Sequence, residues 1–419
     1  MMDVKEDVVV VGAGIVGLAC GFRLLQEGRS VLWIDPNPPG SGASYGNAGT
    51  IADYAVMPVG SPSVLKRLPQ LLFDRDSPLS VQPGAMAMLA PWLARFAYQS
   101  LPGPMRKNIQ ALAPLVLDAG LRWQALARAI SAEDYFKNDG CLYVYGDAAS
   151  LRRGIRDMAL RAKAGVKVAF LTPAELAALE PQWPSLDGGA ALFPESLFVT
   201  DPGRLAGQLF DRGSDAGGRY MMESVEDLII ERDAISLKLG NGQQMRAHKA
   251  VISAGAHSQA LAAKAGDKTP LIAERGYHLE FEGQKNRIQR PVCVADQGFY
   301  MSPMSGRLRV AGTVELGDVD PQPSPHRLAA LTRQAQAIFP DLGVPKRTWL
   351  GFRPSLPDSR PILSRSSRSD RVVYAYGHGH IGLTLAPVSA EIVAALIGNR
   401  SPPFDISAYS AQRFGRWLL

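Results

Sequence analysis

The chain has 419 residues and a mass of 45.1 kDa, with 46% hydrophobic residues, 20% charged residues and a mean hydropathy of −0.03. This composition excludes a disordered chain, and three cysteines are too few for a disulfide scaffold. The net charge of +6 arises from interspersed Lys, Arg, Asp and Glu, so we expect no nucleic-acid partner. The length predicts two or three domains.

The N-terminal segment predicts neither a signal peptide nor a membrane span. Residues 1–7 are mainly acidic, and glycines interrupt the apolar run that begins at Val8. No later run approaches about 18 uncharged apolar residues. The cysteines at 20, 141 and 293 are scattered without CxxC spacing, which indicates reduced core thiols. We therefore expect a cytoplasmic protein.

Residues 8–35 predict a strand, a helix and a second strand. Val8–Val11 is a β-branched run typical of a strand buried on both faces. Apolar residues then recur at helical spacing until Gly28, and residues 30–35 form a strand that ends in Asp35. This unit is typical of a dinucleotide-binding start.

The spacing of the glycines in the turn after Val11 predicts a structural role for each of them. Gly12 makes the tight turn, Gly14 lets backbone amides approach a pyrophosphate, and Gly17 lets the helix pack close to the strand. A carboxylate at Asp35 accepts hydrogen bonds from ribose hydroxyls. A purely structural turn is the alternative, and the motif alone leaves NAD and FAD open.

Two further loops indicate a flavin. A second run of small residues, Ser41–Gly49, offers more backbone amides and a hydroxyl near the pyrophosphate. Near the other end of the chain, residues 377–387 join a buried strand to a helix whose N-terminus would stabilise negative charge on a flavin ring. Such loops at both ends of the chain imply a cofactor long enough to span them.

The intervening chain alternates helical and strand patterns. Residues 58–99 are rich in proline and apolar residues and predict a helical excursion rather than more sheet. The remaining elements are amphipathic helices in 108–130, a strand at 140–145, a helix at 150–165, a three-strand meander over 220–253, strands within 271–315, a helix at 326–339, a buried strand at 372–376 and a helix at 387–396.

Together these motifs resemble the FAD-dependent D-amino acid oxidase/dehydrogenase superfamily, which includes glycine and sarcosine oxidases. The similarity rests on the glycine turn with Asp35, an Ala-Ser loop at 43–49, a Ser-Ala-Gly turn at 253–255, a Gly-Phe-Arg-Pro motif at 351–354 and a Gly-His-Gly-His loop at 377–380. The pattern is most similar to bacterial D-amino acid dehydrogenases, a group that includes D-hydroxyproline dehydrogenases. The resemblance covers nearly the whole chain.

The resemblance implies cofactor contacts position by position. The ADP half of FAD is expected at the glycine turn and Asp35, the pyrophosphate and flavin at the Ala-Ser loop, adenine at Val225, and the flavin pyrimidine edge at the late glycine loop. The expected residues are Gly12, Gly14, Ile15, Val16, Gly17, Asp35, Pro36, Ser44, Asn47, Ala48, Gly49, Val225, Ala254, Gly255, Gly379, His380, Ile381, Gly382, Leu383 and Thr384. Asn47 stands where some relatives carry a flavin-linking His, and residues 356–358 contain no Cys, so we expect non-covalent FAD. We expect no metal, because no Cys or carboxylate accompanies His378 and His380 at ligand spacing.

Three side chains are the candidates for catalysis. The resemblance implies that Arg353 binds the substrate carboxylate, which its planar guanidinium can hold by two hydrogen bonds, with a structural ion pair as the alternative. Tyr277 is a second candidate donor to the carboxylate, with a core tyrosine as the alternative, and His380 could orient substrate or flavin. No side chain stands out as a base. The expected reaction is hydride transfer from Cα of a D-amino acid, or of a cyclic imino acid such as D-proline, to flavin N5.

The expected fold has two discontinuous parts. A Rossmann-like α/β FAD-binding domain takes residues 1–90, 150–265 and 340–419, and an α+β substrate domain with an antiparallel sheet takes residues 91–149 and 266–339. The active site is expected between them.

The motifs do not identify the electron acceptor, which could be a quinone or a carrier protein. The apolar stretch 85–96 and the basic, aromatic C-terminus at 413–419 suit peripheral contact with the inner face of the cytoplasmic membrane, with packed helices and a packed tail as the alternative. An oxygen-dependent glycine or sarcosine oxidase, a non-catalytic FAD-binding subunit and a nicotinamide enzyme remain the competing functions.

Overall fold

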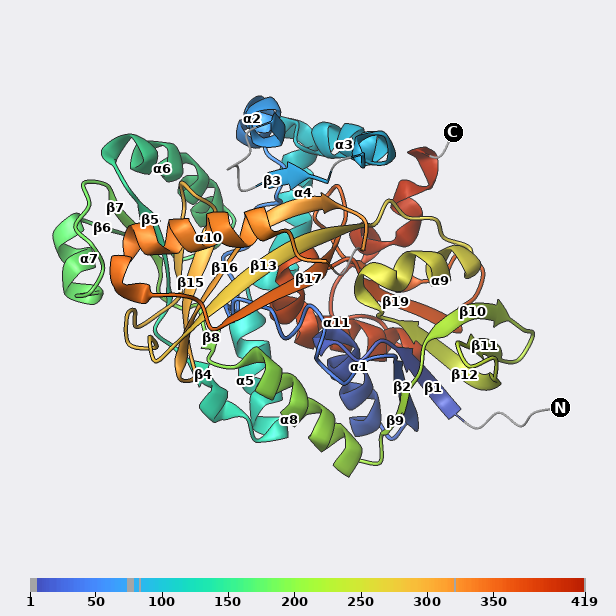
Figure 1. Cartoon of the computed structure of the whole chain (residues 1–419). Coiled ribbons are helices and arrows are strands. Elements are labelled where there is room, and N and C mark those ends of the chain that lie inside the picture. Colours follow the sequence, from blue (N-terminus) through green and yellow to red (C-terminus); the bar gives the residue numbers. More distant parts are fainter. Residues whose placement is uncertain (1–5, 74–78, 83, 320–321, 418–419) are drawn as a thin grey trace.

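The computed structural model describes residues 6–73, 79–82, 84–319 and 322–417. Two sheets organise these residues, and helices pack between and around them (Figure 1). The two sheets share no strand, although the chain passes between them several times.

The first sheet has eight strands around a parallel core. β1 begins the chain and pairs on one side with β2 and on the other with β12, and both pairings are parallel. β9 extends the parallel core beyond β2, and β19 extends it beyond β12. Antiparallel β18 and the meander β10–β11 complete it. The strands are β1 (Glu6–Val11), β2 (Val31–Asp35), β9 (Arg219–Met222), β10 (Val225–Ile230), β11 (Ile235–Leu239), β12 (Gln244–Ile252), β18 (Ile362–Arg365) and β19 (Val372–Tyr376).

The second sheet has nine strands and is mostly antiparallel, as expected. Two of its pairings, β14 with β5 and β16 with β3, are parallel. The strands are β3 (Leu79–Val81), β5 (Cys141–Tyr145), β6 (Ala169–Leu171), β7 (Gly189–Phe193), β13 (Ile272–Glu282), β14 (Val292–Val294), β15 (Phe299–Met304), β16 (Arg307–Gly317) and β17 (Arg347–Ser355). A separate pair joins β4 (Phe136–Lys137) to β8 (Phe198–Val199).

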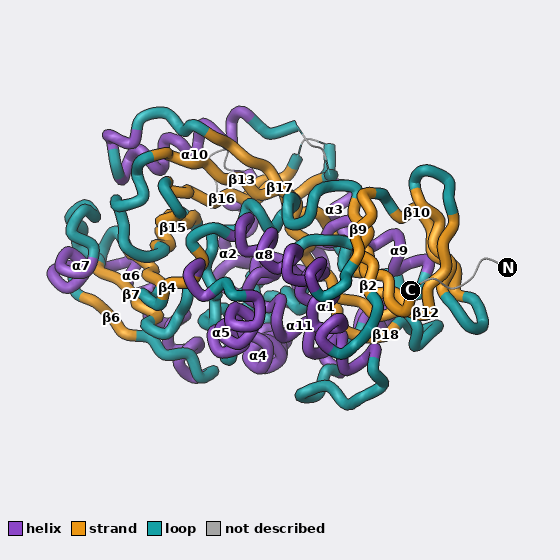
Figure 2. The backbone as a smooth tube through the Cα atoms, turned by 90° about the horizontal axis from the view of Figure 1, so that it is seen from below, coloured by secondary structure: helices purple, strands orange, loops and turns teal. Residues whose placement is uncertain are grey.

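Helices fill the space beside the first sheet. α1 (Ile15–Gln26) packs against α11 (Gly382–Ile397) and α8 (Pro202–Asp215), and α11 also meets α4 (Pro102–Val116) and α5 (Ala119–Ile130) (Figure 2). The other helices are α2 (Pro62–Phe73), α3 (Met86–Gln99), α6 (Ala148–Lys163), α7 (Pro173–Leu179), α9 (Ser258–Lys264) and α10 (Pro325–Ile338). Short 3-10 turns are η1 (Glu133–Tyr135), η2 (Gly255–His257), η3 (Pro340–Leu342), η4 (Gly379–Ile381), η5 (Ser407–Tyr409) and η6 (Ala411–Trp417).

The two faces of the second sheet have different neighbours. Successive side chains of β13 point alternately to one face and to the other. Tyr277, Leu279 and Phe281 point to the outer face, where they share a core with Leu331 of α10. Glu274, Gly276, His278 and Glu280 alternate with them and point to the other face, which we call the inner face. The inner face therefore carries most of the polar side chains of β13.

The expected domain boundaries are wrong at several places. β3, β6, β7 and β17 lie in segments expected in the FAD-binding domain, yet they pair into the second sheet. Conversely, α4 and α5 lie in the expected substrate domain but pack against α11. Residues 58–99 also contain β3, although only helices are expected there. Strand partners far apart in the chain decide these memberships, and local pattern does not specify them.

The expectation that no later segment is long and apolar enough to span a membrane does not hold for Gly379–Ile397. It is long and apolar enough by composition to cross a membrane, with a mean hydropathy of 1.7. However, 78% of it is buried inside the molecule. It is the central core helix, packed between α1, α4 and α5.

Candidate active site

The expected cofactor loops meet at one edge of the first sheet. The glycine turn follows β1, Asp35 ends β2, Ala254 and Gly255 follow β12, and the late glycine loop follows β19. These four strands are parallel neighbours, so their carboxyl ends lie side by side. Ligands bind at this edge in open α/β sheets.

Close backbone approach explains the glycines of the first turn. Gly12 has a φ of +106°, and a Cβ there would lie 2.4 Å from the carbonyl oxygen of Ser253. A Cβ on Gly17 would lie 2.0 Å from the carbonyl oxygen of Gly12. α1 begins after Gly14 with no side-chain cap and no acidic residue in its first turn. Its N-terminus is therefore suited to an anion.

Asp35 and Ser44 lie at the same turn. Asp35 accepts hydrogen bonds from the backbone amides of Ala13 and Asn37, each at 2.9 Å. The hydroxyl of Ser44 accepts one from the amide of Ile15 at 2.8 Å. The loop at 44–49 is thereby joined to the N-terminus of α1.

The second sheet also holds this loop, through residues that sequence reasoning missed. Arg309 on β16 donates to the carbonyls of Tyr45 and Asn47 at 2.8 and 2.6 Å. His278 Nδ1 lies 3.2 Å from the carbonyl oxygen of Gly46. Arg309 also pairs with Glu280 at 2.6 Å, and both side chains are fully buried. A strand pattern gives no signal for such contacts, because they join distant segments.

The ring of Trp349 on β17 completes the support of this loop. It stacks on His278 with ring centroids 5.0 Å apart. A Cβ on Gly46 would lie 2.0 Å from the Trp349 ring, so glycine is required for the ring to pack there. Burial lowers the pKa of His278 to about 3, so the imidazole is neutral at physiological pH.

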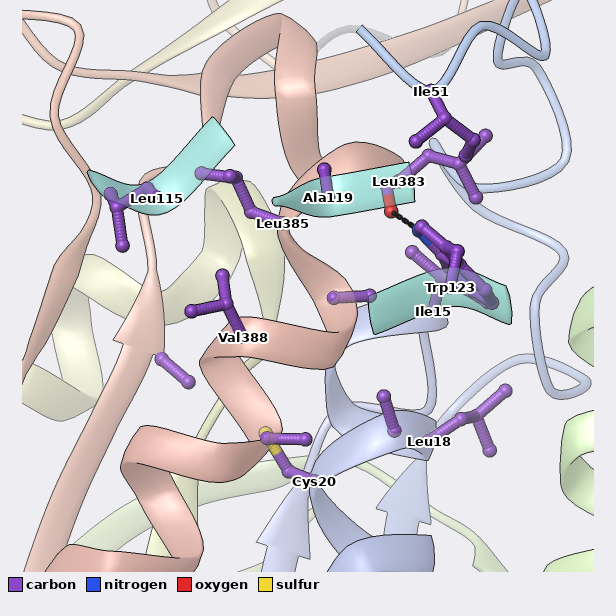
Figure 3. Packing of buried hydrophobic residues seen from close by; sticks show 14 of the residues in the cluster. Ile15, Leu18, Cys20, Ile51, Leu115, Ala119, Trp123, Leu383, Leu385 and Val388 are labelled. Carbon is purple, nitrogen blue, oxygen red and sulfur yellow. Dashed lines mark hydrogen bonds between the residues drawn. The ribbon is translucent and has the colours of Figure 1, made fainter. Parts of the chain in front are cut away.

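Two of the cofactor contacts expected after β19, Leu383 and Thr384, have their side chains inside the protein. The carbonyl of Leu383 accepts a hydrogen bond from Trp123 Nε1 at 2.8 Å, and the Leu383 side chain lies in the core beside Ile15 and Ile51 (Figure 3). The Thr384 hydroxyl accepts from the amide of Ala52 at 2.9 Å. These contacts hold the N-terminus of α11 against the core.

Val225 also lies at this edge of the sheet. It begins β10, two residues after Glu223, whose amide donates to the carbonyl of Asp35 at 3.1 Å. Gly255 has a φ of +56° in η2. The contacts of Val225, Ala254, Gly255 and the other expected residues with a cofactor stay predictions.

Arg353, His380 and Glu274 form one cluster on the inner face. Arg353 on β17 lies opposite Glu274 on β13, and its Nη1 lies 3.4 Å from Glu274 Oε1. His380 Nε2 lies 2.8 Å from the same oxygen, and the Ser355 hydroxyl donates to Glu274 Oε2 at 2.7 Å. β17 contacts both η2 and η4. The second sheet thus brings Arg353 against the expected flavin loops.

The Glu274 carboxylate is buried but ionised. Burial alone would raise its pKa, but His380, Arg353 and the Ser355 hydroxyl together hold the pKa at about 2. The side chain of Glu274 is 6% exposed, that of Arg353 is 22% exposed and that of His380 is 37% exposed. The two cationic or basic groups are therefore accessible, whereas their shared carboxylate is not.

Tyr277 does not join this cluster. It lies on the outer face, and its hydroxyl donates to Glu315 at 2.6 Å and accepts from Arg275. Its expected role at the substrate carboxylate is wrong, because successive residues of β13 point to opposite faces of the sheet. The alternative, a core tyrosine, is the one that the structure shows.

Sequence reasoning also missed how the Arg353 guanidinium is accommodated. A Cβ on Gly276 would lie 2.3 Å from Arg353 Cζ, so the guanidinium lies directly over this glycine. A bulge in the β13–β16 pairing places Thr313 at a φ of +57°, and its carbonyl lies 3.5 Å from Arg353 Nη1. The sequence offers only Gly276 as a signal, because the left-handed conformation of Thr313 is visible only in the structure.

Comparison with known proteins identifies the family. The model of the FAD-dependent oxidoreductase family DAO matches residues 7–396, so the chain belongs to this family. It is 29% identical to a D-amino-acid oxidase of Bradyrhizobium diazoefficiens over 99% of this chain and all of that protein. It is also 29% identical to D-amino acid dehydrogenase 2 of Ralstonia nicotianae over 97% of this chain and all of that protein.

Solved structures share the fold. Glycine oxidase from Geobacillus kaustophilus superposes with a TM-score of 0.80 at 23% identity, covering 97% of this chain and 98% of that one. L-proline dehydrogenase from P. horikoshii superposes with a TM-score of 0.75 at 20% identity over the whole of both chains. The chain therefore shares the two-sheet fold of these two structures.

The residues present fit FAD. Side chains on Gly12 and Gly17 would overlap neighbouring backbone atoms, and the N-terminus of α1, which follows Gly14 and has no acidic residue in its first turn, lies beside them. Asp35 and the Ser44 loop lie at the same sheet edge. In residues 6–73, 79–82, 84–319 and 322–417, no three His, Cys, Asp or Glu side chains gather as a metal-binding set.

Proposed function

We propose that this FAD-dependent oxidoreductase dehydrogenates D-amino acids, or cyclic imino acids such as D-proline, at Cα. The observation that carries the proposal is the position of Arg353, an accessible guanidinium on the inner face beside η4 and Glu274. A fixed cation of this kind next to the flavin loops suits a small carboxylate substrate. It also argues against a non-catalytic FAD-binding subunit.

Arg353 would bind the substrate carboxylate through its guanidinium. This contact fixes one end of the substrate, so that Cα–H can be held against the cofactor. FAD, bound non-covalently by the residues at the edge of the first sheet, supplies the acceptor for the hydride. The imine product would hydrolyse in water to a keto acid and ammonia, and a cyclic imino acid would give a pyrroline.

An oxidase that transfers electrons to oxygen is the second candidate. The relative from Bradyrhizobium diazoefficiens carries the name D-amino-acid oxidase, whereas that from Ralstonia nicotianae carries the name dehydrogenase. The two candidates share the reductive half-reaction and differ only in the acceptor. We favour a quinone or another carrier because of the surface of α3.

The exposed surface of α3 is apolar. Its exposed positions are Met86, Ala87, Met88, Ala90, Pro91, Ala94 and Tyr98, and none of them is charged. Lys66 and Arg67 of α2 and Arg106 and Lys107 of α4 are exposed cations on the neighbouring helices in the chain. An apolar helix face with flanking cations suits an anionic lipid surface. We propose that this protein is cytoplasmic and that the exposed surface of α3 contacts the inner face of the cytoplasmic membrane.

The C-terminus contributes less to such a surface than its sequence indicates. Arg413 pairs with the buried carboxylate of Asp358 at 2.8 Å, and Phe414 is buried. This part of the tail is packed, as in the alternative interpretation. The side chains of residues 416–417, and residues 418–419 altogether, lie outside the described part of the chain.

Anaerobic bleaching of the flavin tests the function. The purified holoprotein is mixed without oxygen with D- and L-amino acids, D-proline, cis-4-hydroxy-D-proline, glycine and sarcosine. We expect a D-amino or D-imino acid to bleach the flavin, and a quinone analogue to restore its colour faster than air. Rapid recovery in air with peroxide formation would identify an oxidase, and a flavin that no substrate bleaches would contradict the proposal.

Vesicle sedimentation tests the membrane contact. We expect the protein to bind vesicles with anionic lipid, and a Met86→Asp/Met88→Asp variant to bind at least tenfold more weakly because it places charge on the apolar face. Leu121→Asp is the matched control, since this exposed apolar residue lies on α5. Equal binding of all three proteins, or binding of none, would contradict the proposal.

A further inference from the structure

The contacts of Glu274 go beyond a carboxylate anchor. This glutamate lies on the inner face of β13 and binds groups from two other segments, β17 and η4. Its two oxygens accept hydrogen bonds from Ser355 and Arg353, and Oε1 also lies 2.8 Å from His380 Nε2. A buried strand carboxylate that holds a half-exposed imidazole is arranged to orient that ring.

We propose that His380 is the base that removes the proton from the substrate amino group, and that Glu274 is the positioning residue that orients it. This inference rests on the proposed function, since it concerns the same substrate. It adds a proton acceptor for which the sequence shows no candidate.

The 2.8 Å contact between His380 Nε2 and Glu274 Oε1 decides which nitrogen can act. An ionised carboxylate only accepts, so the proton between them lies on His380 Nε2. In the neutral imidazole the lone pair then lies on Nδ1. Within the described part of the chain no hydrogen bond involves that nitrogen, and the ring is 37% exposed. Nδ1 is therefore the atom available to the substrate amine.

The surrounding charges suit this role. Glu274 and Arg353 are the charged groups that face His380 from β13 and β17. His378 of the same loop lies 2.9 Å from the Ser389 hydroxyl, and burial lowers its pKa to about 3, so it adds no charge. With His380 neutral, Arg353 and Glu274 balance each other. When His380 gains a proton, the substrate carboxylate on Arg353 balances the added charge.

The proposed step is balanced as follows. An N–H bond of the substrate ammonium breaks, its electron pair stays on nitrogen, and the proton forms an N–H bond with His380 Nδ1. The Cα–H bond then breaks with its electron pair leaving as hydride to FAD, and the nitrogen lone pair forms the C=N bond of the iminium. The substrate loses two electrons and the cofactor gains them. The proton on His380 passes to solvent at the exposed ring.

The pH dependence of kcat/KM tests this role in His380→Gln and Glu274→Gln. We expect wild-type kcat/KM to fall on acidification as the base becomes protonated. In His380→Gln, kcat/KM should drop about 10²- to 10⁴-fold near pH 7 and rise with the fraction of free amine up to the pKa of the substrate. In Glu274→Gln, kcat/KM should fall less than in His380→Gln, because the base remains but loses the carboxylate that orients it. His248→Gln, an exposed histidine on β12, is the control and should match wild type.

Binding of a compound without an amino group shows whether His380 acts as a base or instead binds the substrate carboxylate. The ligand is the 2-hydroxy acid with the substrate's side chain, and its binding is followed through the flavin spectrum, which also reports that each variant is folded. We expect His380→Gln to change this affinity by less than about twofold. A tenfold weaker affinity together with an unchanged acid limb would make His380 a carboxylate ligand and overturn the proposal.

Different measurements contradict the two proposals: activity of the wild type tests the proposed function, and the pH profile of His380→Gln tests the base. If wild type oxidises amino acids and His380→Gln keeps its acid limb, the base assignment alone is wrong. If wild type oxidises none, the proposed function is wrong, and the base assignment is wrong with it.

Discussion

At the scale of single residues, the active site depends on what surrounds Arg353. The arginine is identifiable from its Gly-Phe-Arg-Pro motif, but the surface beneath it is not. Its guanidinium lies over Gly276, where any side chain would overlap it. Its neighbour Glu274 is buried and ionised. The site thus combines one motif residue with partners that have no motif of their own.

Gly276→Ala should separate substrate binding from stability. The three atoms nearest to a Cβ at this position, at 2.3–2.4 Å, all belong to the guanidinium of Arg353, so the new methyl group forces this flexible side chain aside. We expect KM to rise about tenfold or more, because a charged hydrogen bond contributes about 1.5–3 kcal/mol, whereas Tm should change by less than about 2 °C. Gly103→Ala, where a Cβ would meet nothing within 4 Å, is the control. An unchanged KM would show that the guanidinium position does not matter.

At the scale of elements, the first strand–turn–helix unit depends on backbone contact with β12. The carbonyl of Ser253 lies where a side chain on Gly12 would stand, and Gly17 packs on Gly12 in turn. The turn therefore joins β1, α1 and β12 at the sheet edge. Its glycines are readable from the sequence because the turn geometry is local, whereas the identity of the strand that presses on it is not.

Gly12→Ala should abolish cofactor binding. The new Cβ would lie 2.4 Å from a backbone oxygen that cannot move without shifting β12, and the φ of +106° is itself unfavourable for alanine. We expect a colourless protein with a lowered Tm. Gly28→Ala also has a positive φ, +78°, but meets nothing within 4 Å, so it should cost only about 1–2 kcal/mol and keep its flavin. Flavin-to-protein absorbance ratios and thermal unfolding measure the difference, and equal behaviour of the two variants would contradict it.

At the scale of the whole molecule, the loop at 44–49 couples the two sheets. It bonds to α1 through Ser44, and three of its consecutive carbonyls face Arg309 and His278 of the second sheet. Arg309 is in turn neutralised by Glu280. The cofactor loop is therefore shaped by strands that belong to the other sheet.

Arg309→Gln should weaken both FAD binding and stability. It removes two hydrogen bonds to the loop and the fully buried partner of Glu280, whose second partner, Arg307 at 2.8 Å, remains, so we expect a loss of about 1.5–3 kcal/mol. Arg347→Gln is the control, because its pairing with Glu282 at 3.5 Å is exposed. FAD affinity and urea unfolding are the measurements. If only stability fell, the loop would not depend on Arg309 for its cofactor-binding shape.

Acid should destabilise the whole molecule through buried histidines. Burial lowers the folded-state pKa of His278 and His378 to about 3, so between about pH 6.5 and pH 3 only the unfolded chain binds these protons. Their contribution to stability is complete above about pH 6.5 and falls with decreasing pH. Glu274, with a folded pKa of about 2, adds a loss of the same sign below about pH 4.5.

Urea unfolding of wild type and His378→Gln at pH 7 and pH 5 measures this effect. The variant should lose less stability on acidification than wild type, because glutamine can bond to Ser389 without titrating. Burial raises the pKa of Asp53 to about 6, which acts in the opposite direction, but this contribution is common to both proteins and cancels in the comparison. An identical loss in both would contradict the assignment.

Residue spacing alone identifies the glycine turn, Asp35, the two loops expected to contact the flavin and Arg353, and these motifs indicate the family and its cofactor. Each of these follows from residue spacing along a short segment, where the required backbone geometry restricts the residue types. The helices and the meander at 220–253 were readable for the same reason. Their alternation and periodicity are local.

The remaining features depend on contacts between segments that are distant in the chain. Strand pairing placed β7 and β17 in the second sheet, turned Tyr277 to the outer face and brought Glu274 to His380. These outcomes depend on which distant strands align and in which register, and a shift of one residue would exchange the two faces. The partners of Arg353 are therefore a property of the folded sheet rather than of any motif.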